Sequence, residues 1–165
     1  MSDAGFQLPA ADRAPDPIVH FELYRGLAWK RAFAYFVDVA IIAAIMAVAV
    51  FVLGVIGVVT FGLFNPLLIA VFALIPFLYH TLLLGGPRHA TLGMGLFGVE
   101  MRSLTNGHPD NVQAAIQTVL FYLSVGLTGW LIVIWALFDP RRRMLHDILA
   151  GTYVVNRRAA LGVPA

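Results

Sequence analysis

The stretch FAYFVDVAIIAAIMAVAVFVLGVIGVV, residues 33–59, decides the fold of this chain. Asp38 is the only acidic or basic residue within it. An apolar run of this length can cross a bilayer, because about 20 helical residues at about 1.5 Å each traverse a hydrocarbon core of about 30 Å. The stretch therefore predicts a transmembrane helix that carries one carboxyl group near its beginning.

A second apolar run, residues 67–84, follows a turn at residues 60–66. It predicts a second transmembrane helix, with a kink at Pro76 that helices in a bilayer tolerate. A Gly-Gly-Pro sequence then ends this helix. The glycine-rich residues 89–103 are too short and too polar to span, so we expect a short amphipathic segment that is partly extended around residues 98–101.

The composition of the whole chain agrees with a lipid environment. Hydrophobic residues make up 60% and charged residues 12%, against about 45–50% and about 25% in ordinary soluble domains. The basic residues flank the apolar runs as membrane anchors do, rather than forming the basic face of a nucleic-acid-binding protein. The absence of cysteine excludes disulfides and thiolate metal sites.

The third apolar stretch, residues 111–138, leaves the topology open. One full crossing would place the arginines at 141–143 outside, against the positive-inside tendency. We therefore expect two half-helices, residues 112–123 and 130–138, that form a re-entrant or kinked hairpin with both ends in the cytoplasm. The alternative is an all-α membrane protein of three or four simple transmembrane helices.

The segments outside the apolar runs complete the domain organisation. We interpret residues 1–24 as a disordered or partner-ordered tail, residues 25–156 as the membrane domain and residues 157–165 as a C-terminal tail. The first apolar run lacks a cleavage site of small residues, so it is not a secretory signal peptide. Its basic flank predicts a cytoplasmic N-terminus in a bacterial inner membrane.

Three motifs, in order along the chain, resemble the RDD family of small membrane proteins. The first is an arginine with an aspartate seven residues later, the second a Thr-Leu-Gly element followed by Gly-Val, and the third a closing motif, FDPRRR with LHD. The residues that carry the resemblance are Arg31, Asp38, Thr91, Gly93, Gly98, Asp139, Arg141, His146 and Asp147. Met94 and Glu100 occupy positions that are usually basic in the family. The resemblance implies a membrane module, and transport, including sodium–proton exchange, is suggested for some members.

Asp38 and His80 are the candidate ionisable groups within the membrane. An acidic side chain in a span is a functional-site hypothesis, because its burial is costly unless it binds a cation, relays a proton or holds a partner. Since the second span runs back toward the cytoplasm, Tyr79 and His80 should lie at nearly the depth of Asp38. A basic residue from 141–143, or His146, is another possible partner of Asp38.

Arg31 should point away from Asp38, because helical side chains lean toward the N-terminus. We expect it to reach the headgroups or to bind Asp139 or Asp147 of the closing motif. An Arg–Asp–His–Asp set of this kind can also serve only to fasten the C-terminal segment beneath the helices.

No sequence pattern indicates catalysis, a cofactor or a metal site. His89 and His108 lie in expected loops without ligand spacing, and we expect both to be solvated. The chain is therefore not expected to be an enzyme. Two functions remain: ion or small-ligand transport as a homo-oligomer with Asp38 as the ionisable centre, or a non-catalytic accessory or assembly subunit of a larger membrane complex. In either case the lipid bilayer is a partner and nucleic acid is not.

Overall fold

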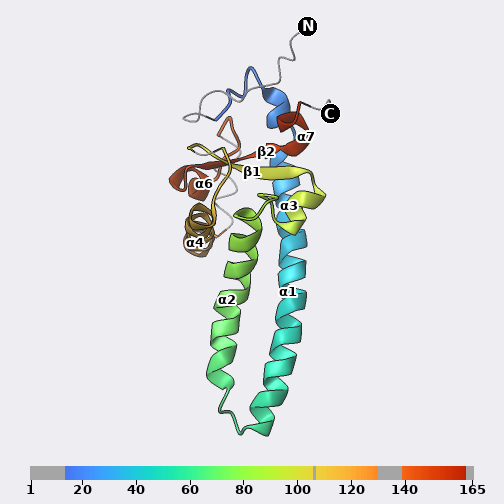
Figure 1. The fold of residues 1–165 in the computed structure, drawn as a ribbon, viewed down its shortest axis with the longest axis vertical. Helices are drawn as coiled ribbons and strands as arrows, with labels where there is room; N and C mark the ends of the chain where they lie inside the picture. The colour runs from blue at the N-terminus through green and yellow to red at the C-terminus, as the bar shows by residue number, and fades with distance from the viewer. Residues whose placement is uncertain (1–13, 106, 130–138, 163–165) are drawn as a thin grey trace.

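Two long antiparallel helices form a hairpin that projects from a compact head (Figure 1). The computed structural model describes residues 14–105, 107–129 and 139–162. The hairpin consists of α1 (Leu27–Val59) and α2 (Asn65–Leu84). The head contains the first turns of α1 and the shorter elements η1 (Phe21–Leu23), α3 (Leu92–Leu96), β1 (Val99–Ser103), α4 (Asn111–Thr128), α6 (Leu145–Leu149), β2 (Thr152–Asn156) and α7 (Arg157–Ala160).

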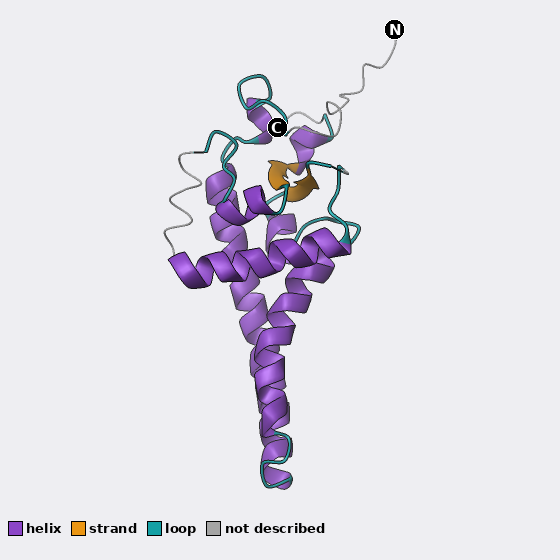
Figure 2. Cartoon of the chain, turned by 90° about the vertical axis from the view of Figure 1, so that its left-hand side faces the viewer, coloured by secondary structure: helices purple, strands orange, loops and turns teal. Residues whose placement is uncertain are grey.

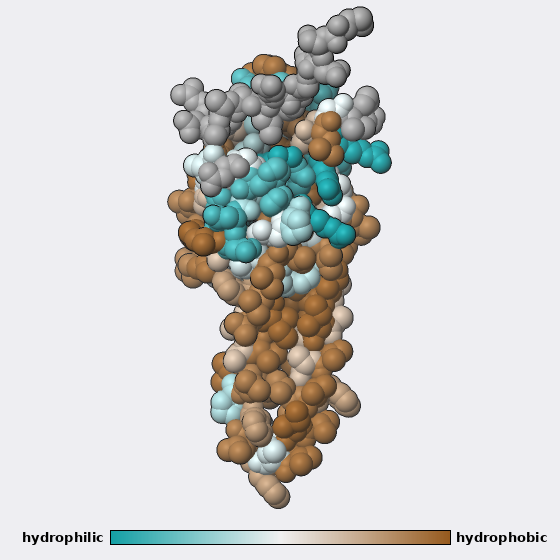
Figure 3. All heavy atoms as spheres, viewed as in Figure 1, coloured by the Kyte–Doolittle hydropathy of each residue, from teal (hydrophilic) through white to brown (hydrophobic). Residues whose placement is uncertain are grey.

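The two predicted spans are confirmed as candidate membrane helices. Among the described residues, two helices are long and apolar enough to cross a bilayer, Phe21–Val59 and Pro66–Leu84. In the most apolar window of the first, no residue is buried within the chain. Figure 3 shows apolar side chains over the hairpin and polar ones gathered on the head. A surface of this kind is stable only against lipid or the helices of another protein.

The first helix begins earlier than its apolar run indicates. Gly26 precedes it with a left-handed backbone at φ 64°, and the 33 residues of α1 rise about 50 Å. That length exceeds the hydrocarbon thickness of about 30 Å. The polar first turns of α1 therefore lie within the head, beside α3 (Figure 1).

A two-stranded antiparallel sheet closes the head. β1 pairs with β2 from Val99 opposite Asn156 to Ser103 opposite Thr152. The extended backbone predicted around residues 98–101 is confirmed, and β2 was not predicted. All residues of both strands are buried, so neither strand has the alternation of polar and apolar residues by which a half-buried strand is recognised.

The core of the head includes residues that we assigned to the N-terminal tail. Ala14, Leu23 and Tyr24 are buried in the same cluster as Val99 of β1. The Tyr24 hydroxyl donates a hydrogen bond to the carbonyl of Pro15 at 2.9 Å. The part of that tail from residue 14 onward is therefore packed against the head.

The helix α4 lies across the head-side end of the hairpin instead of parallel to it (Figure 2). It contains the first predicted half-helix, residues 112–123, but continues to Thr128 and ends at Gly129, whose φ is 57°. We had placed the turn of the hairpin directly after residue 123, and this position is wrong, because the helix continues through residues 124–128. The hydroxyls of Ser124 and Thr128 bond to carbonyls of the preceding turn, at 2.9 Å and 2.6 Å, and so remain compatible with helix. The second half-helix, residues 130–138, lies outside the described residues.

Candidate functional site

Asp38 joins three segments where the hairpin enters the head. Its Oδ1 accepts hydrogen bonds from the Tyr79 hydroxyl at 2.6 Å and from the Gly93 backbone N–H at 2.8 Å. Its Oδ2 accepts one from the Thr91 hydroxyl at 2.6 Å. The residue is only 3% exposed. A buried carboxylate requires such donors, and these come from α2, from the N-cap of α3 and from the first turn of α3.

The Thr-Leu-Gly motif is explained by this contact. Thr91 is the N-cap of α3, so its Oγ1 donates to Asp38 while accepting from the Met94 N–H at 3.1 Å. Gly93 is required by space, because a Cβ there would lie 2.2 Å from the carbonyl oxygen of Ala34. The motif therefore docks α3 on α1 and supplies two donors to Asp38.

Arg31 binds the closing motif, as expected. Its Nη1 lies 2.6 Å from Oδ2 of Asp147 and 3.3 Å from the carbonyl of Arg142. Asp147 is fully buried and also accepts from the Gln117 amide at 2.8 Å and the Met144 N–H at 2.9 Å. Burial alone would raise the pKa of Asp147, but attraction by Arg31 and His146 outweighs it and lowers that pKa. This ion pair ties α1 to α6.

Asp139, the other acid of the closing motif, organises its own loop. Its Oδ2 accepts from the backbone N–H of Arg141 at 3.1 Å and of Arg143 at 2.9 Å, and Oδ1 lies 3.2 Å from Nη2 of Arg143. These hydrogen bonds outweigh the effect of burial, so the pKa of Asp139 is lowered. Asp139 therefore shapes the arginine turn rather than binding Arg31.

The two histidines of the predicted site lie on different elements. His146 of α6 is buried, with Nδ1 3.2 Å from the Ser124 hydroxyl and Nε2 3.5 Å from Asp147. Burial lowers the pKa of His146, and the attraction of Asp147 opposes this only in part. His80 of α2 has its Nδ1 3.0 Å from the carbonyl of Pro76 and 3.1 Å from the Tyr122 hydroxyl.

Of the neighbours predicted for Asp38, Tyr79 makes the contact. Within the described ranges, the hydrogen bonds given for Asp38 come from Tyr79, Thr91 and Gly93 and not from either histidine, and Arg143 pairs with Asp139. His80 lies beside Asp38 along the wall of the same cavity. Sequence spacing therefore predicted that Tyr79 lies near Asp38 but did not reveal Thr91 and Gly93 as donors.

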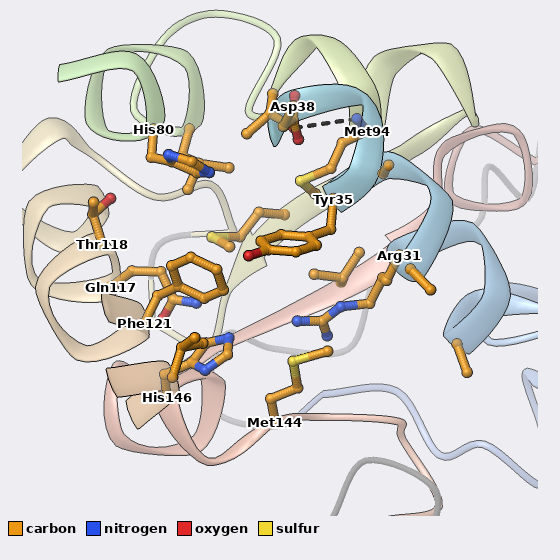
Figure 4. A pocket seen from close by; sticks show the side chains of 18 of the residues that line it. Arg31, Tyr35, Asp38, His80, Met94, Gln117, Thr118, Phe121, Met144 and His146 are labelled. Carbon is orange, nitrogen blue, oxygen red and sulfur yellow. Dashed lines mark hydrogen bonds between the residues drawn. The ribbon is translucent and has the colours of Figure 1, made fainter. Parts of the chain in front are cut away.

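A cavity of about 150 Å³ lies between the Asp38 contact and the Arg31–Asp147 pair (Figure 4). Arg31, Asp38, His80, Gln117 and His146 are engaged with the protein partners described above, and much of the remaining surface is thioether, aromatic and aliphatic. Such a surface suits a small apolar group better than a hydrated ion. The side chains that line it include Arg31, Tyr35, Asp38, His80, Met94, Met101, Gln117, Phe121, Met144 and His146.

A second buried charge cluster was missed by sequence reasoning. Glu100 of β1 forms an ion pair with Arg102, whose Nε donates at 2.7 Å, and its Oε2 lies 3.5 Å from Nε of Arg157. Gly98, at φ 65°, provides the left-handed residue that leads into this strand. The available signal was the two-residue spacing of Glu100 and Arg102, which places both side chains on one face of a strand.

We predicted that His89 and His108 are solvated; His108 is exposed, whereas His89 is half-buried. Their ring centroids lie 4.3 Å apart, and Nδ1 of His89 is buried without a hydrogen-bond partner in the described part of the chain. Burial, then Arg102 and His89, lowers the pKa of His108. Across residues 14–105, 107–129 and 139–162, no group of three or more histidine or acidic side chains is placed to hold a metal ion.

An apolar hairpin fastened to a small head by two buried carboxylates defines a membrane-anchored module. The model of the RDD family matches residues 25–151, and the chain belongs to this family. No curated protein and no solved structure shows a match to the chain. The family assignment agrees with the positions of the three motifs, which meet at the end of the hairpin.

Proposed function

We propose that this RDD protein is a non-catalytic accessory subunit of a larger membrane complex. In this proposal the hairpin docks beside partner helices and the head lies at the cytoplasmic face of a bacterial inner membrane. The observation that carries the proposal is the segregation of polarity along the hairpin. Residues 39–59 and 66–78 contain no polar side chain, and, apart from Thr60 and Asn65 at the far turn, the polar groups of the described residues gather at the end that carries the head.

This segregation argues against a hydrophilic path through the hairpin. An ion that crosses a membrane needs polar side chains, backbone groups or water along its route. Repeating the same two helices around an oligomer axis would add only apolar side chains in the far part of the bilayer. The arrangement of Asp38 agrees with a fastening role, because its oxygens accept three hydrogen bonds from groups within the chain.

The outward surface of α1 supports docking against another helix. Ala40, Ala43, Ala44 and Ala47 are all exposed, at spacings that place most of them along one side. Small residues allow helix backbones to approach closely within lipid, where packing rather than the hydrophobic effect drives association.

The experiment is to extract the protein from native membranes in mild detergent and determine the composition of the particle. We expect stoichiometric co-purification with a larger complex. Ala44→Leu should reduce this co-purification, because the larger side chain keeps the partner helix away. Ile69→Leu on α2, which keeps the volume of an exposed apolar side chain, is the matched control and should have no effect. A small homo-oligomer without other proteins would contradict the proposal.

A second candidate function is ion or small-ligand transport by a homo-oligomer. One observation favours it, namely that Asp38 and His80 border the same cavity. In reconstituted vesicles, this function predicts ion or ligand flux that Asp38→Asn abolishes while the protein remains folded and inserted. Absence of flux from the wild-type homo-oligomer would exclude it for the ions and ligands tested.

A further inference from the structure

The helix α4 has an apolar stripe that nothing in the described chain covers. Val112, Ile116, Val119, Leu123 and Leu127 follow one another at intervals of three or four residues, which places them on one helix face. Their exposed fractions range from 46% to 85%. The opposite face is buried in the head and carries Ala114, Gln117, Thr118 and Ser124. The helix therefore turns its polar side chains toward the head and presents an apolar face outward, as a helix in contact with lipid does.

The level at which α4 crosses the hairpin matches the edge of the hydrocarbon core. Phe121 of α4 stacks on His80, with ring centroids 5.7 Å apart, and the neighbouring Tyr79 binds Asp38. From Asp38 to Val59, α1 rises about 32 Å, close to the hydrocarbon thickness of about 30 Å. If the far end of α1 lies at one boundary, Asp38 and α4 lie at the other.

A groove between α2 and α4 connects the stripe to the surface of the hairpin. Almost all of the groove is apolar, and the Tyr122 hydroxyl, its one polar side-chain group, is turned to His80. The groove is therefore continuous with the surface that α2 presents to lipid, and acyl chains are its natural occupant. The side chains that line it are Phe72, Ala73, Leu74, Pro76, Phe77, Val119, Tyr122 and Leu123.

We infer that α4 lies in the plane of the membrane, in the leaflet on the side of the head, with its stripe and the groove against lipid acyl chains. The third apolar stretch thus begins as an interfacial helix rather than as a third span. The head is consequently held to the bilayer by α4 as well as by the hairpin. This inference does not depend on whether the chain has a partner complex.

The absence of cysteine allows single nitroxide labels to be placed without altering the background. The variants Ile116→Cys and Leu123→Cys are labelled with a nitroxide and placed in phosphatidylcholine vesicles. The accessibility of each nitroxide to oxygen, which concentrates in the lipid, is compared with its accessibility to a water-soluble nickel chelate. Val52→Cys on α1 is the lipid-exposed reference, and Ile18→Cys on the head is the water-exposed reference. Melting temperatures establish that each labelled protein is folded, and Leu127→Cys replaces any position at which the label disturbs the fold.

We expect both positions on α4 to be more accessible to oxygen than Ile18→Cys, at one shared depth shallower than that of Val52→Cys. A spanning helix would instead separate these two labels by about 10 Å in depth, because they are seven residues apart. A difference of that size would overturn the inference. It would also be overturned if both labels behaved like Ile18→Cys, or if both were shielded from the two reagents.

Discussion

At the scale of single residues, Asp38 and Asp147 determine how the chain is held together. Each carboxylate is buried and accepts hydrogen bonds from segments distant in sequence. The sequence identified both residues, because an acid in an apolar run and a motif rich in charges stand out locally. It did not identify Thr91 and Gly93 as partners of Asp38, because these contacts span 53 and 55 positions and have no local signature.

Asp38→Asn should destabilise the protein. The amide is neutral and has one acceptor oxygen instead of two, so the hydrogen bonds from Tyr79 and Gly93 weaken and the Thr91 hydroxyl must accept from the amide instead of donating. We expect a loss on the order of 2–3 kcal/mol, seen as a lower melting temperature in detergent. Tyr79→Phe removes one donor and leaves the others, so it should cost about 1 kcal/mol. An unchanged melting temperature for Asp38→Asn would contradict the fastening role.

The stability of the head should fall on mild acidification. Burial holds the pKa of His146 in the folded protein below its ordinary value of 6.5. Below about pH 6.5, His146 therefore binds a proton more readily in the unfolded chain than in the folded one, which favours unfolding. The contribution of His146 is therefore complete above that pH and is lost as the pH falls further. Melting curves between pH 7.5 and 5 measure the slope, and His146→Gln should make it shallower. A slope unchanged by this substitution would contradict the prediction.

At the scale of elements, local patterns predicted the spans well and the head poorly. Hydropathy is a local property, so both helices of the hairpin were found from sequence. The start of α1 was misjudged because Lys30 and Arg31 interrupt the apolar pattern without interrupting the helix. β2 was missed because burial of every residue removes the alternation that reveals a strand.

The packing of α3 on α1 is so close at Gly93 that adding a single methyl group there should lower the stability of the protein. In Gly93→Ala, the new Cβ would lie 2.2 Å from the carbonyl oxygen of Ala34 and 2.9 Å from Cγ of Asp38. Backbone atoms would have to move, at a cost of about 1–3 kcal/mol. Gly95→Ala in the same short helix meets nothing within 4 Å and should be neutral or slightly stabilising. Thermal melting of the two variants in one detergent makes the comparison. Equal effects would contradict the tight packing described here.

At the scale of the whole molecule, the fold places both described ends of the chain in the head. Residues 14–24 and α7 pack there, whereas Phe61 lies in the turn between α1 and α2. This arrangement requires an even number of membrane crossings between the two ends.

Labelling with a membrane-impermeant maleimide tests this arrangement. Ile18→Cys and Leu161→Cys lie on the head and should react from the same side of the membrane, whereas Phe61→Cys should react from the opposite side. Lysed vesicles provide the control in which all three positions react. Reaction of Ile18→Cys and Leu161→Cys from opposite sides would indicate an odd number of crossings and would contradict the fold.

The Arg31–Asp147 pair has a consequence for how the protein is made. Asp38 meets Tyr79 after 41 further residues, so its first partner arrives when the hairpin has been synthesised. The partner of Arg31, Asp147, is synthesised 116 residues later, and the partner of Lys30, Asn156, is synthesised 126 residues later. During translation the hairpin can therefore enter the membrane early while the head stays open. A nascent chain that stops before α6 lacks Asp147, so α1 is not yet tied to α6 and the head stays incomplete until the last part of the chain has been made.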